Sequence, residues 1–373
     1  MTNRSFSAII LFALLIFSVT PLVGANSTMW SQTYGGSGHN DSNSLVETSD
    51  GGYAIAGYTD SFGAGNNDFW LVKTDATGTQ EWNQTYGGTG YDVCFSLIQT
   101  SDNGFALAGY TDSVSTGGYD FWMVKTDEYG NADWSNAYGE LGDDIAYSLI
   151  ETSDGGYALA GYTDFLTAGN DDFCLIKVTS TGTLAWNKAY GGTENERASS
   201  IIELSTGEFV LAGYTNSFGA GNNDYWLIKT TAIGTLEWNQ TYGGPNVEYA
   251  NQLLATPDGG YALAGTTNSF GAGEYDFWLV KTDTNGNLAW DQTYGGTGYD
   301  VANSLVETSD GGYSLTGPTR SFGSGLSSFW LVKTDENGII PEFPSWTILP
   351  LLLFATATAI IYTKRLHKPN QQS

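Results

Sequence analysis

The sequence is poor in basic residues, histidine and cysteine. Its 373 residues include 13 Lys and Arg against 40 Asp and Glu, a formal net charge of −27. A domain this acidic repels phosphate groups, so no nucleic-acid partner is expected. Only two histidines occur, His39 and His367, and the second lies in a basic C-terminal tail. This scarcity argues against a His-based catalytic triad or a histidine metal cluster.

The chain instead contains a repeat of 52 residues. A tryptophan recurs at this step at Trp30, Trp82, Trp134, Trp186, Trp238 and Trp290, and a lysine at Lys73, Lys125, Lys177, Lys229, Lys281 and Lys333. A fixed period of about 50 residues is the signature of a repeat architecture. Two cysteines break the pattern: Cys94 replaces Ser or Ala, and Cys174 replaces a Trp found in the other five copies. Both are expected to be small core substitutions.

Each repeat predicts four short strands, at 44–48, 53–59, 69–74 and 79–86 in the first full copy. Turns rich in Gly, Asp and Asn separate them. Four antiparallel strands per 40–50 residues are typical of one blade of a β-propeller. The sequence therefore predicts an all-β, six-bladed β-propeller over residues 26–340, with four-stranded antiparallel blades.

The last copy ends at Lys333 without a fourth strand, while a spare fourth strand surrounds Trp30. We therefore expect the N-terminal strand to complete the last blade. Such a closed ring would remove both exposed sheet edges and favour a monomer.

The two termini predict export and anchoring. Residues 1–25 combine Arg4, an apolar run and small residues before Asn26, which indicates a signal peptide, with a membrane anchor as the alternative. A Pro-rich spacer at 341–345 leads to an apolar run at 346–362, just long enough for a transmembrane helix. The basic tail at 363–373 would stay in the cytoplasm and leave the propeller on the extracellular side of the membrane.

Three segments resemble known families. The PEFP motif at 341–344, with the apolar run and basic tail, resembles the C-terminal sorting signals of archaeal surface proteins. That resemblance implies cleavage and a lipid anchor, and a simple single-span anchor is the alternative. KTDATGTQEW at 73–82 resembles the tryptophan-docking motif of quinoprotein propellers, with one residue fewer between Asp75 and Gly78. It implies that each Trp packs one blade against the next, and it implies no quinone cofactor.

The third resemblance covers about 310 residues. Copies of the TSDGGYALAGYT…DFWLVKTD type resemble cell-surface proteins built from tandem propeller repeats. That family implies the propeller fold and a surface location, and it carries no well-defined activity.

The candidate ligand-binding residues are acidic positions ten residues after each Trp. They are Asp92, Asp144, Glu196, Glu248 and Asp300, with Asn40 in the first copy. On a propeller they would lie near the channel mouth, where carboxylates could bind Ca²⁺ or another cationic ligand. The alternative is that they bond to local backbone N–H groups. No other metal or cofactor is expected.

Two basic sets complete the candidates. Arg197 and Arg320 are the only arginines of the repeat region, are expected on the same face, and could clamp an anionic group; repeat drift is the alternative. The recurring lysines are expected to pair with Glu47, Glu151, Glu203 and Glu307 of their own copies.

These observations predict an exported, membrane-anchored cell-surface propeller that acts in binding or adhesion, with a surface protein or a glycan as its ligand. One alternative is a glycan hydrolase using paired carboxylates such as Asp144 and Glu196 on the top face. Another is a purely structural component of the cell envelope. No catalytic residue is assigned, and a non-enzyme is favoured.

Overall fold

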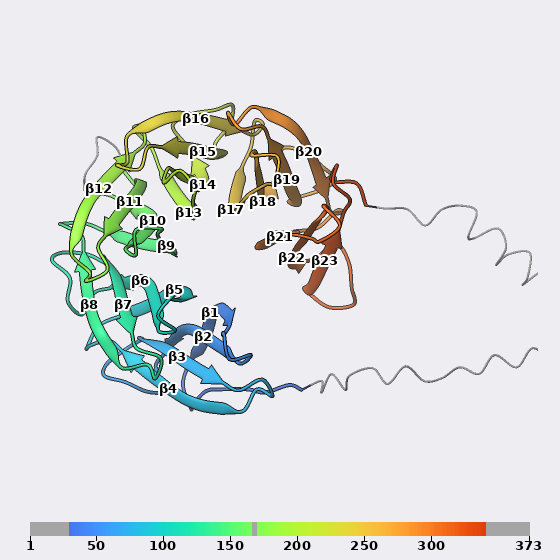
Figure 1. Cartoon of the computed structure of the whole chain (residues 1–373). Helices are drawn as coiled ribbons and strands as arrows, with labels where there is room; N and C mark the ends of the chain where they lie inside the picture. The colour runs from blue at the N-terminus through green and yellow to red at the C-terminus, as the bar shows by residue number, and fades with distance from the viewer. Residues whose placement is uncertain (1–29, 166–169, 341–373) are drawn as a thin grey trace, which may run out of the picture.

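Six radial antiparallel sheets surround a central space, as Figure 1 shows for this computed structural model, which describes residues 30–165 and 170–340. Blade 1 contains β1 (Asn40–Glu47), β2 (Tyr53–Thr59), β3 (Asp68–Thr74) and β4 (Gln80–Tyr86); blade 2 contains β5 (Asp92–Gln99), β6 (Phe105–Thr111), β7 (Asp120–Thr126) and β8 (Ala132–Tyr138); blade 3 contains β9 (Asp144–Glu151), β10 (Tyr157–Thr163), β11 (Asp172–Val178) and β12 (Leu184–Tyr190). Blade 4 contains β13 (Glu196–Glu203), β14 (Phe209–Thr215), β15 (Asp224–Thr230) and β16 (Leu236–Tyr242); blade 5 contains β17 (Glu248–Ala255), β18 (Tyr261–Thr267), β19 (Asp276–Thr282) and β20 (Leu288–Tyr294); blade 6 contains β21 (Ser304–Glu307), β22 (Tyr313–Thr319) and β23 (Ser328–Lys333). The six-bladed propeller is confirmed, and blades 1 to 5 have the predicted four antiparallel strands.

Tight turns fix the strand order inside each blade. Between β1 and β2, the Asp50 carboxylate accepts hydrogen bonds from Thr48 Oγ1 at 2.5 Å and Gly52 N at 3.0 Å. Gly51 has φ of 82°, a left-handed conformation that suits glycine. The first strand of each blade lies innermost and the fourth outermost (Figure 1).

The core lies between the blades. At the junction of blades 1 and 2, Phe69 and Leu71 of β3 pack against Leu97 and Phe105 of the next blade, and all four are almost fully buried. Five such clusters fill the five junctions from blade 1 to blade 6. Burial of apolar area at each junction, about 25 cal/mol per Å², is the main force that holds the blades together.

Each fourth strand docks on the next blade through its tryptophan. Trp82 of β4 covers Gly130, whose φ is 79° and where a Cβ would lie 2.6 Å from the indole ring. Tyr86 Oη, from the same strand, donates a hydrogen bond to the Gly130 carbonyl at 2.7 Å. These contacts show the structural role that was expected for the recurring tryptophan, the packing of one blade against the next.

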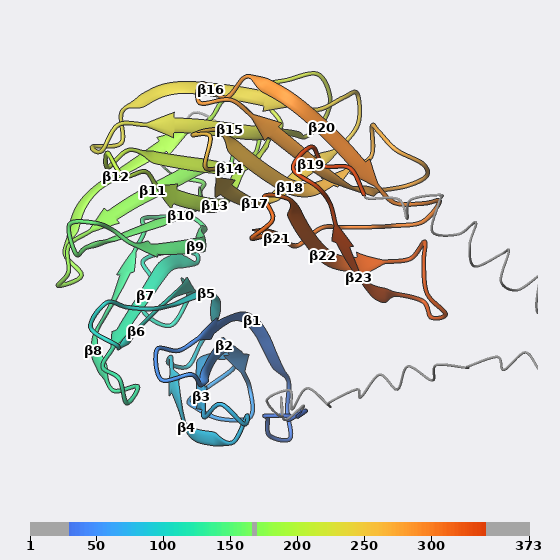
Figure 2. The same ribbon diagram turned by 45° about the vertical axis from the view of Figure 1, so that its right-hand side comes forward.

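The prediction that the N-terminal strand completes blade 6 is wrong. Blade 6 has three strands, and residues 30–36 form no ladder with β23. They keep only the docking contacts of a fourth strand with blade 1, where Trp30 Nε1 donates to Ala76 O at 3.1 Å and Tyr34 Oη to Gly78 O at 2.5 Å. Figures 1 and 2 show the first and last blades at the two ends of an open arc, because the curvature set by the five junctions leaves β23 apart from this segment.

The predicted signal peptide and the predicted spacer, apolar run and tail of 341–373 lie outside the described residues, so they stay predictions. Within residues 30–165 and 170–340, no helix is long and apolar enough to cross a membrane.

Candidate functional site

The five recurring carboxylates are buried where the inner strands begin. Asp92, Asp144, Glu196, Glu248 and Asp300 are each at most 5 % exposed. Each accepts a hydrogen bond from the backbone N–H four residues earlier, at 2.7–3.2 Å. Their recurrence is therefore accounted for by bracing of the connecting loops, the alternative raised from the sequence.

The pKa values of two of these acids are shifted in opposite directions. Burial raises the pKa of Glu196, but hydrogen bonds from Gly192 N, Thr215 Oγ1 and Ser217 N outweigh it and the net pKa is lowered. For Asp144 burial dominates and raises the pKa to about 6. A glycan hydrolase needs two carboxylates facing one bond. Asp144 and Glu196 begin different blades, and both oxygens of Glu196 accept structural hydrogen bonds, so the hydrolase alternative gains no support.

A second acid approaches each of these carboxylates across the blade junction. A Cβ placed on Gly243 would lie 1.7 Å from Asp224 Oδ1 and 2.6 Å from Glu248 Oε2, so only glycine fits between the two acids. Burial and the charge of Glu248 raise the pKa of Asp224. Across the part of the chain that the structure describes, no group of three or more His, Cys, Asp or Glu could hold a metal ion.

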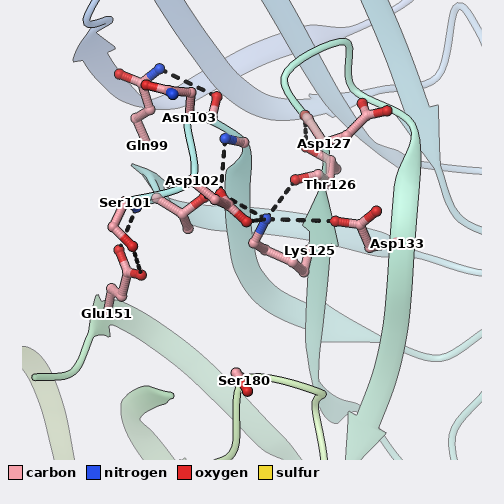
Figure 3. Close-up of polar contacts among 12 residues, drawn as sticks. Gln99, Ser101, Asp102, Asn103, Lys125, Thr126, Asp127, Asp133, Glu151 and Ser180 are labelled. Carbon is pink, nitrogen blue, oxygen red and sulfur yellow. Dashed lines mark hydrogen bonds and ion pairs between the residues drawn. The ribbon is translucent and has the colours of Figure 1, made fainter. Parts of the chain in front are cut away.

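The recurring lysine has a different partner from the one expected. Figure 3 shows Lys125 Nζ between Asp102 Oδ2 at 2.8 Å, Thr126 O at 2.8 Å and Asp133 Oδ2 at 3.6 Å. Glu151, the predicted partner of Lys177 in its own blade, instead accepts hydrogen bonds from Ser101 N at 2.7 Å and Ser101 Oγ at 2.6 Å of the preceding blade, and Lys177 Nζ bonds to Asp154 Oδ1 at 2.9 Å. The Lys–Glu prediction is wrong because the turn after the first strand brings its aspartate nearer to the lysine. The role remains structural.

The two arginines lie in different blades, and each has its own partners. Arg197 of β13 bonds to Asp171 through Nη2 at 2.5 Å and through Nε at 2.7 Å. Its guanidinium lies 4.2 Å from the centre of the Tyr162 ring. Arg320 lies 5.4 Å from the Tyr299 ring centre in blade 6. Arg197 therefore stacks on a tyrosine of the preceding blade, and Arg320 lies over a tyrosine on the connection that enters its own blade.

Aromatic side chains on the first and second strands of neighbouring blades form a row that we call the inner aromatic row. Its members are Phe95, Tyr110, Tyr147, Tyr162, Tyr214 and Tyr249. Ring centres are 6.0 Å apart for Phe95 and Tyr110, 5.1 Å for Phe95 and Tyr147, and 6.1 Å for Tyr147 and Tyr162. Tyr214 and Tyr249 are 4.9 Å apart. The row follows inner strands that border the central space (Figure 1).

Arg197 joins the two parts of the row. It stacks on Tyr162, and its charge acts on both Tyr147 and Tyr214, opposing the increase that burial causes in their pKa values. The sequence identified Arg197 as a departure from the repeat but missed the aromatic residues. For Phe95 and Tyr147 the signal was the repeat position two residues after that of Arg197, which varies between copies and holds Asn43, Phe95, Tyr147, Ser199, Asn251 and Asn303.

No known family model matches the chain. A curated relative, the regulatory protein FlaEY of Caulobacter vibrioides, is 23 % identical over 247 residues, which are 58 % of this chain and 25 % of that protein. The chain thus spans about a quarter of that relative's length.

Solved structures are similar to this chain at low sequence identity. Sqt1 of Chaetomium thermophilum, in complex with the N-terminus of ribosomal protein L10, gives a TM-score of 0.50 at 11 % identity, covering 74 % of this chain and 68 % of that one. The propeller domain of the Trilobed protease of Pyrococcus furiosus gives 0.42 at 8 % identity, covering 78 % and 79 %. At these identities the likeness concerns the fold alone.

Proposed function

We propose that this protein is an exported, membrane-anchored propeller that binds a protein partner through the inner aromatic row. The observation that carries the proposal is the row itself: aromatic rings linked across blades, all partly exposed except the buried Tyr162, with Phe95, Tyr147 and Tyr249 at positions where the repeats differ. Tyrosine offers large, rigid contact area together with a polar group, which is why it is frequent at protein interfaces. The Sqt1 complex is a precedent for protein binding on this architecture.

Charge favours a partner segment with basic side chains. Asp112 lies close enough to Tyr110, and Asp143 and Asp171 close enough to Tyr162, for their charges to add to the effect of burial in raising the pKa of each tyrosine. The row is thus bordered by carboxylates on a chain with a net charge of −27. Such a surface attracts a basic segment and accelerates its association at low ionic strength.

The location rests on the terminal segments of the sequence. A signal peptide at 1–25 and an apolar run at 346–362 followed by basic residues would place the propeller outside the cell. Protease treatment of intact cells tests this, because an exposed propeller is released while a cytoplasmic control protein survives. Complete protection of the propeller would contradict the proposed location.

Crosslinking in cells tests the binding site. We expect the full-length tagged protein to give a discrete crosslinked adduct with another protein, and the double variant Tyr147→Ala/Tyr249→Ala to lower its yield at least tenfold. Tyr129→Ala is the matched control, because Tyr129 is 63 % exposed on the outer turn between β7 and β8 and should leave the yield unchanged.

Two outcomes would contradict the proposal. An equal adduct yield for the double variant would move the site away from the row. An adduct that glycosidase removes and protease leaves intact would make the ligand a glycan. Circular dichroism of each variant checks that the fold is retained.

A further inference from the structure

Blade 3 lacks an indole that every other blade has. At the third position of its third strand, β11 carries Cys174, where the other blades carry Trp70, Trp122, Trp226, Trp278 and Trp330. At four junctions this indole packs on an aromatic ring of the preceding blade, with ring centres 4.5–4.9 Å apart. In the cluster between blades 2 and 3, Phe121 occupies the place of that aromatic ring, and Cys174 occupies the place of the indole.

Among the described residues, the neighbouring side chains do not fill the space. A pocket of about 270 Å³ remains between blades 2 and 3, lined by Cys174 and Ile176 of β11, Tyr138 of β8, Leu184 and Asn187 of β12, and Asp144 of β9 among others. An apolar cavity of about 150 Å³ is enough to bind benzene. The larger pocket in blade 3 therefore has room for a two-ring system.

The polar partner of the missing indole is still present. Trp70 Nε1 donates to Asn83 Oδ1 at 3.1 Å, and Trp226 Nε1 donates to Asn239 Oδ1 at 3.2 Å. Asn187 holds the same repeat position in blade 3 and lines the pocket. No hydrogen bond from the described residues reaches its side chain. The pocket thus keeps an acceptor at the place where an indole N–H would point.

The remaining wall suits a flat ring. Ile176, Leu184 and the ring of Tyr138 give apolar contact, and Tyr138 Oη is occupied by a hydrogen bond to Gly182 O at 2.7 Å. Asp144 adds a second acceptor at the opposite blade edge. A planar ring with one N–H donor matches this arrangement, whereas an anionic ligand would meet the carboxyl group of Asp144.

We propose that the pocket of blade 3 binds a planar aromatic heterocycle the size of indole, with its ring N–H donated to Asn187 Oδ1. The ring replaces the tryptophan that the other blades supply from within the chain. The site is separate from the inner aromatic row and does not depend on the proposed function. The ring can belong to a free small molecule or to a tryptophan side chain of a peptide, and both present the same chemistry.

Calorimetric titration of the full chain with indole tests the proposal. We expect saturable binding at one site per chain, and Cys174→Trp should weaken it at least tenfold because it fills the pocket with the residue of the other repeats. Its melting temperature should rise, which also shows that the variant folds. The matched variant Trp226→Cys should open the equivalent space in blade 4, next to Asn239, and raise the stoichiometry to two.

The N–H contact is tested without changing the core. Asn187→Leu in the protein, or 1-methylindole as the probe, should each weaken binding about tenfold, because each removes one side of the same hydrogen bond. Titration with N-acetyltryptophanamide distinguishes the sources: affinity equal to or above that of indole points to a peptide side chain, and weaker affinity to a free heterocycle. Absence of saturable indole binding, equal binding by Cys174→Trp, or equal affinity for 1-methylindole would overturn the proposal.

Discussion

The last two blades carry the same apolar side chains in the same register and hold them in opposite environments. Phe277 and Leu279 of blade 5 are fully buried under blade 6, whereas Phe329 and Leu331 of blade 6 are 96 % and 69 % exposed. The other end of the arc behaves likewise, since Leu45 of blade 1 is 62 % exposed and its counterpart Leu97 is 3 % exposed. The repeat therefore encodes a surface that is complementary to its neighbour, and burial depends on whether a neighbour is there.

The open ends are also more polar in sequence. Ser314 and Thr316 of blade 6 replace Ala262 and Ala264 of blade 5. Each junction has a buried pair of acids, and both open ends lack one. Ser328 replaces the aspartate that begins the third strand of the other blades, and Asn40 replaces the acid that precedes or begins the first strand. These changes favour contact with water, and they match an open arc better than a closed ring.

The largest difference in the free energy of unfolding is expected between alanine variants of Phe277 in blade 5 and Phe329 in blade 6. Phe277→Ala should lower the free energy of unfolding by about 3–5 kcal/mol because it leaves a cavity in a packed junction. Phe329→Ala should change it by less than about 0.5 kcal/mol because its ring contacts mainly solvent. Urea unfolding of the two variants measures both values, and similar losses would mean that blade 6 has a neighbour.

A smaller difference is expected for the docking tryptophans. Trp238 lies between Tyr261, at 6.0 Å between ring centres, and Gly286 of the next blade. Trp30 makes the same contacts with Tyr53 and Gly78 but is 40 % exposed and belongs to no strand ladder. Trp238→Ala should cost about 2–3 kcal/mol and Trp30→Ala about 1 kcal/mol. If Trp30→Ala cost as much as Trp238→Ala, residues 30–36 would be a full strand of the propeller.

The smallest effect is a pH dependence at the junction of blades 2 and 3. Burial raises the pKa of Asp144 from 3.8 to about 6, so the folded protein holds this proton more tightly than the unfolded chain does. The stability that this proton contributes is full below about pH 4, falls as the pH rises toward 6, and is lost above it.

Asp144→Asn removes this pH-dependent contribution to stability. As the pH rises from 4 to 7, the melting temperature of the wild type should therefore fall relative to that of the variant. At the open end, Asn40→Asp places an acid at the equivalent, half-exposed position and should give a weaker pH dependence. Parallel melting curves for the wild type and Asp144→Asn across this range would contradict the raised pKa.

The sequence predicted the features that recur in every repeat. Strands expected at 53–59 and 69–74 occur as β2 (Tyr53–Thr59) and β3 (Asp68–Thr74), because turns with Asp and Gly and alternating apolar residues are local signals. It did not predict contacts that depend on three-dimensional placement. Lys177 bonds to the turn residue Asp154 rather than to Glu151 of its own blade. Phe95 and Tyr147 meet only because two blades stand at a fixed angle.

The open arc could not be predicted for a similar reason. The missing fourth strand of blade 6 and the spare segment around Trp30 are both evident in the sequence. Whether they meet depends on the curvature that five junctions add together, and no single repeat encodes that sum. For Cys174, the sequence showed the lost tryptophan, and the structure showed that the side chains it describes around Cys174 leave this space open.

Hydrogen exchange across the strands tests most directly the claim that the propeller has two free ends. Amides of β9–β16, with packed blades on both sides, should exchange slowest, and those of β1–β4 and β21–β23 at least tenfold faster, because end blades can open without breaking a second junction. Equal protection of β21–β23 and β9–β16, with slow exchange in residues 30–36, would show a closed ring and contradict the account.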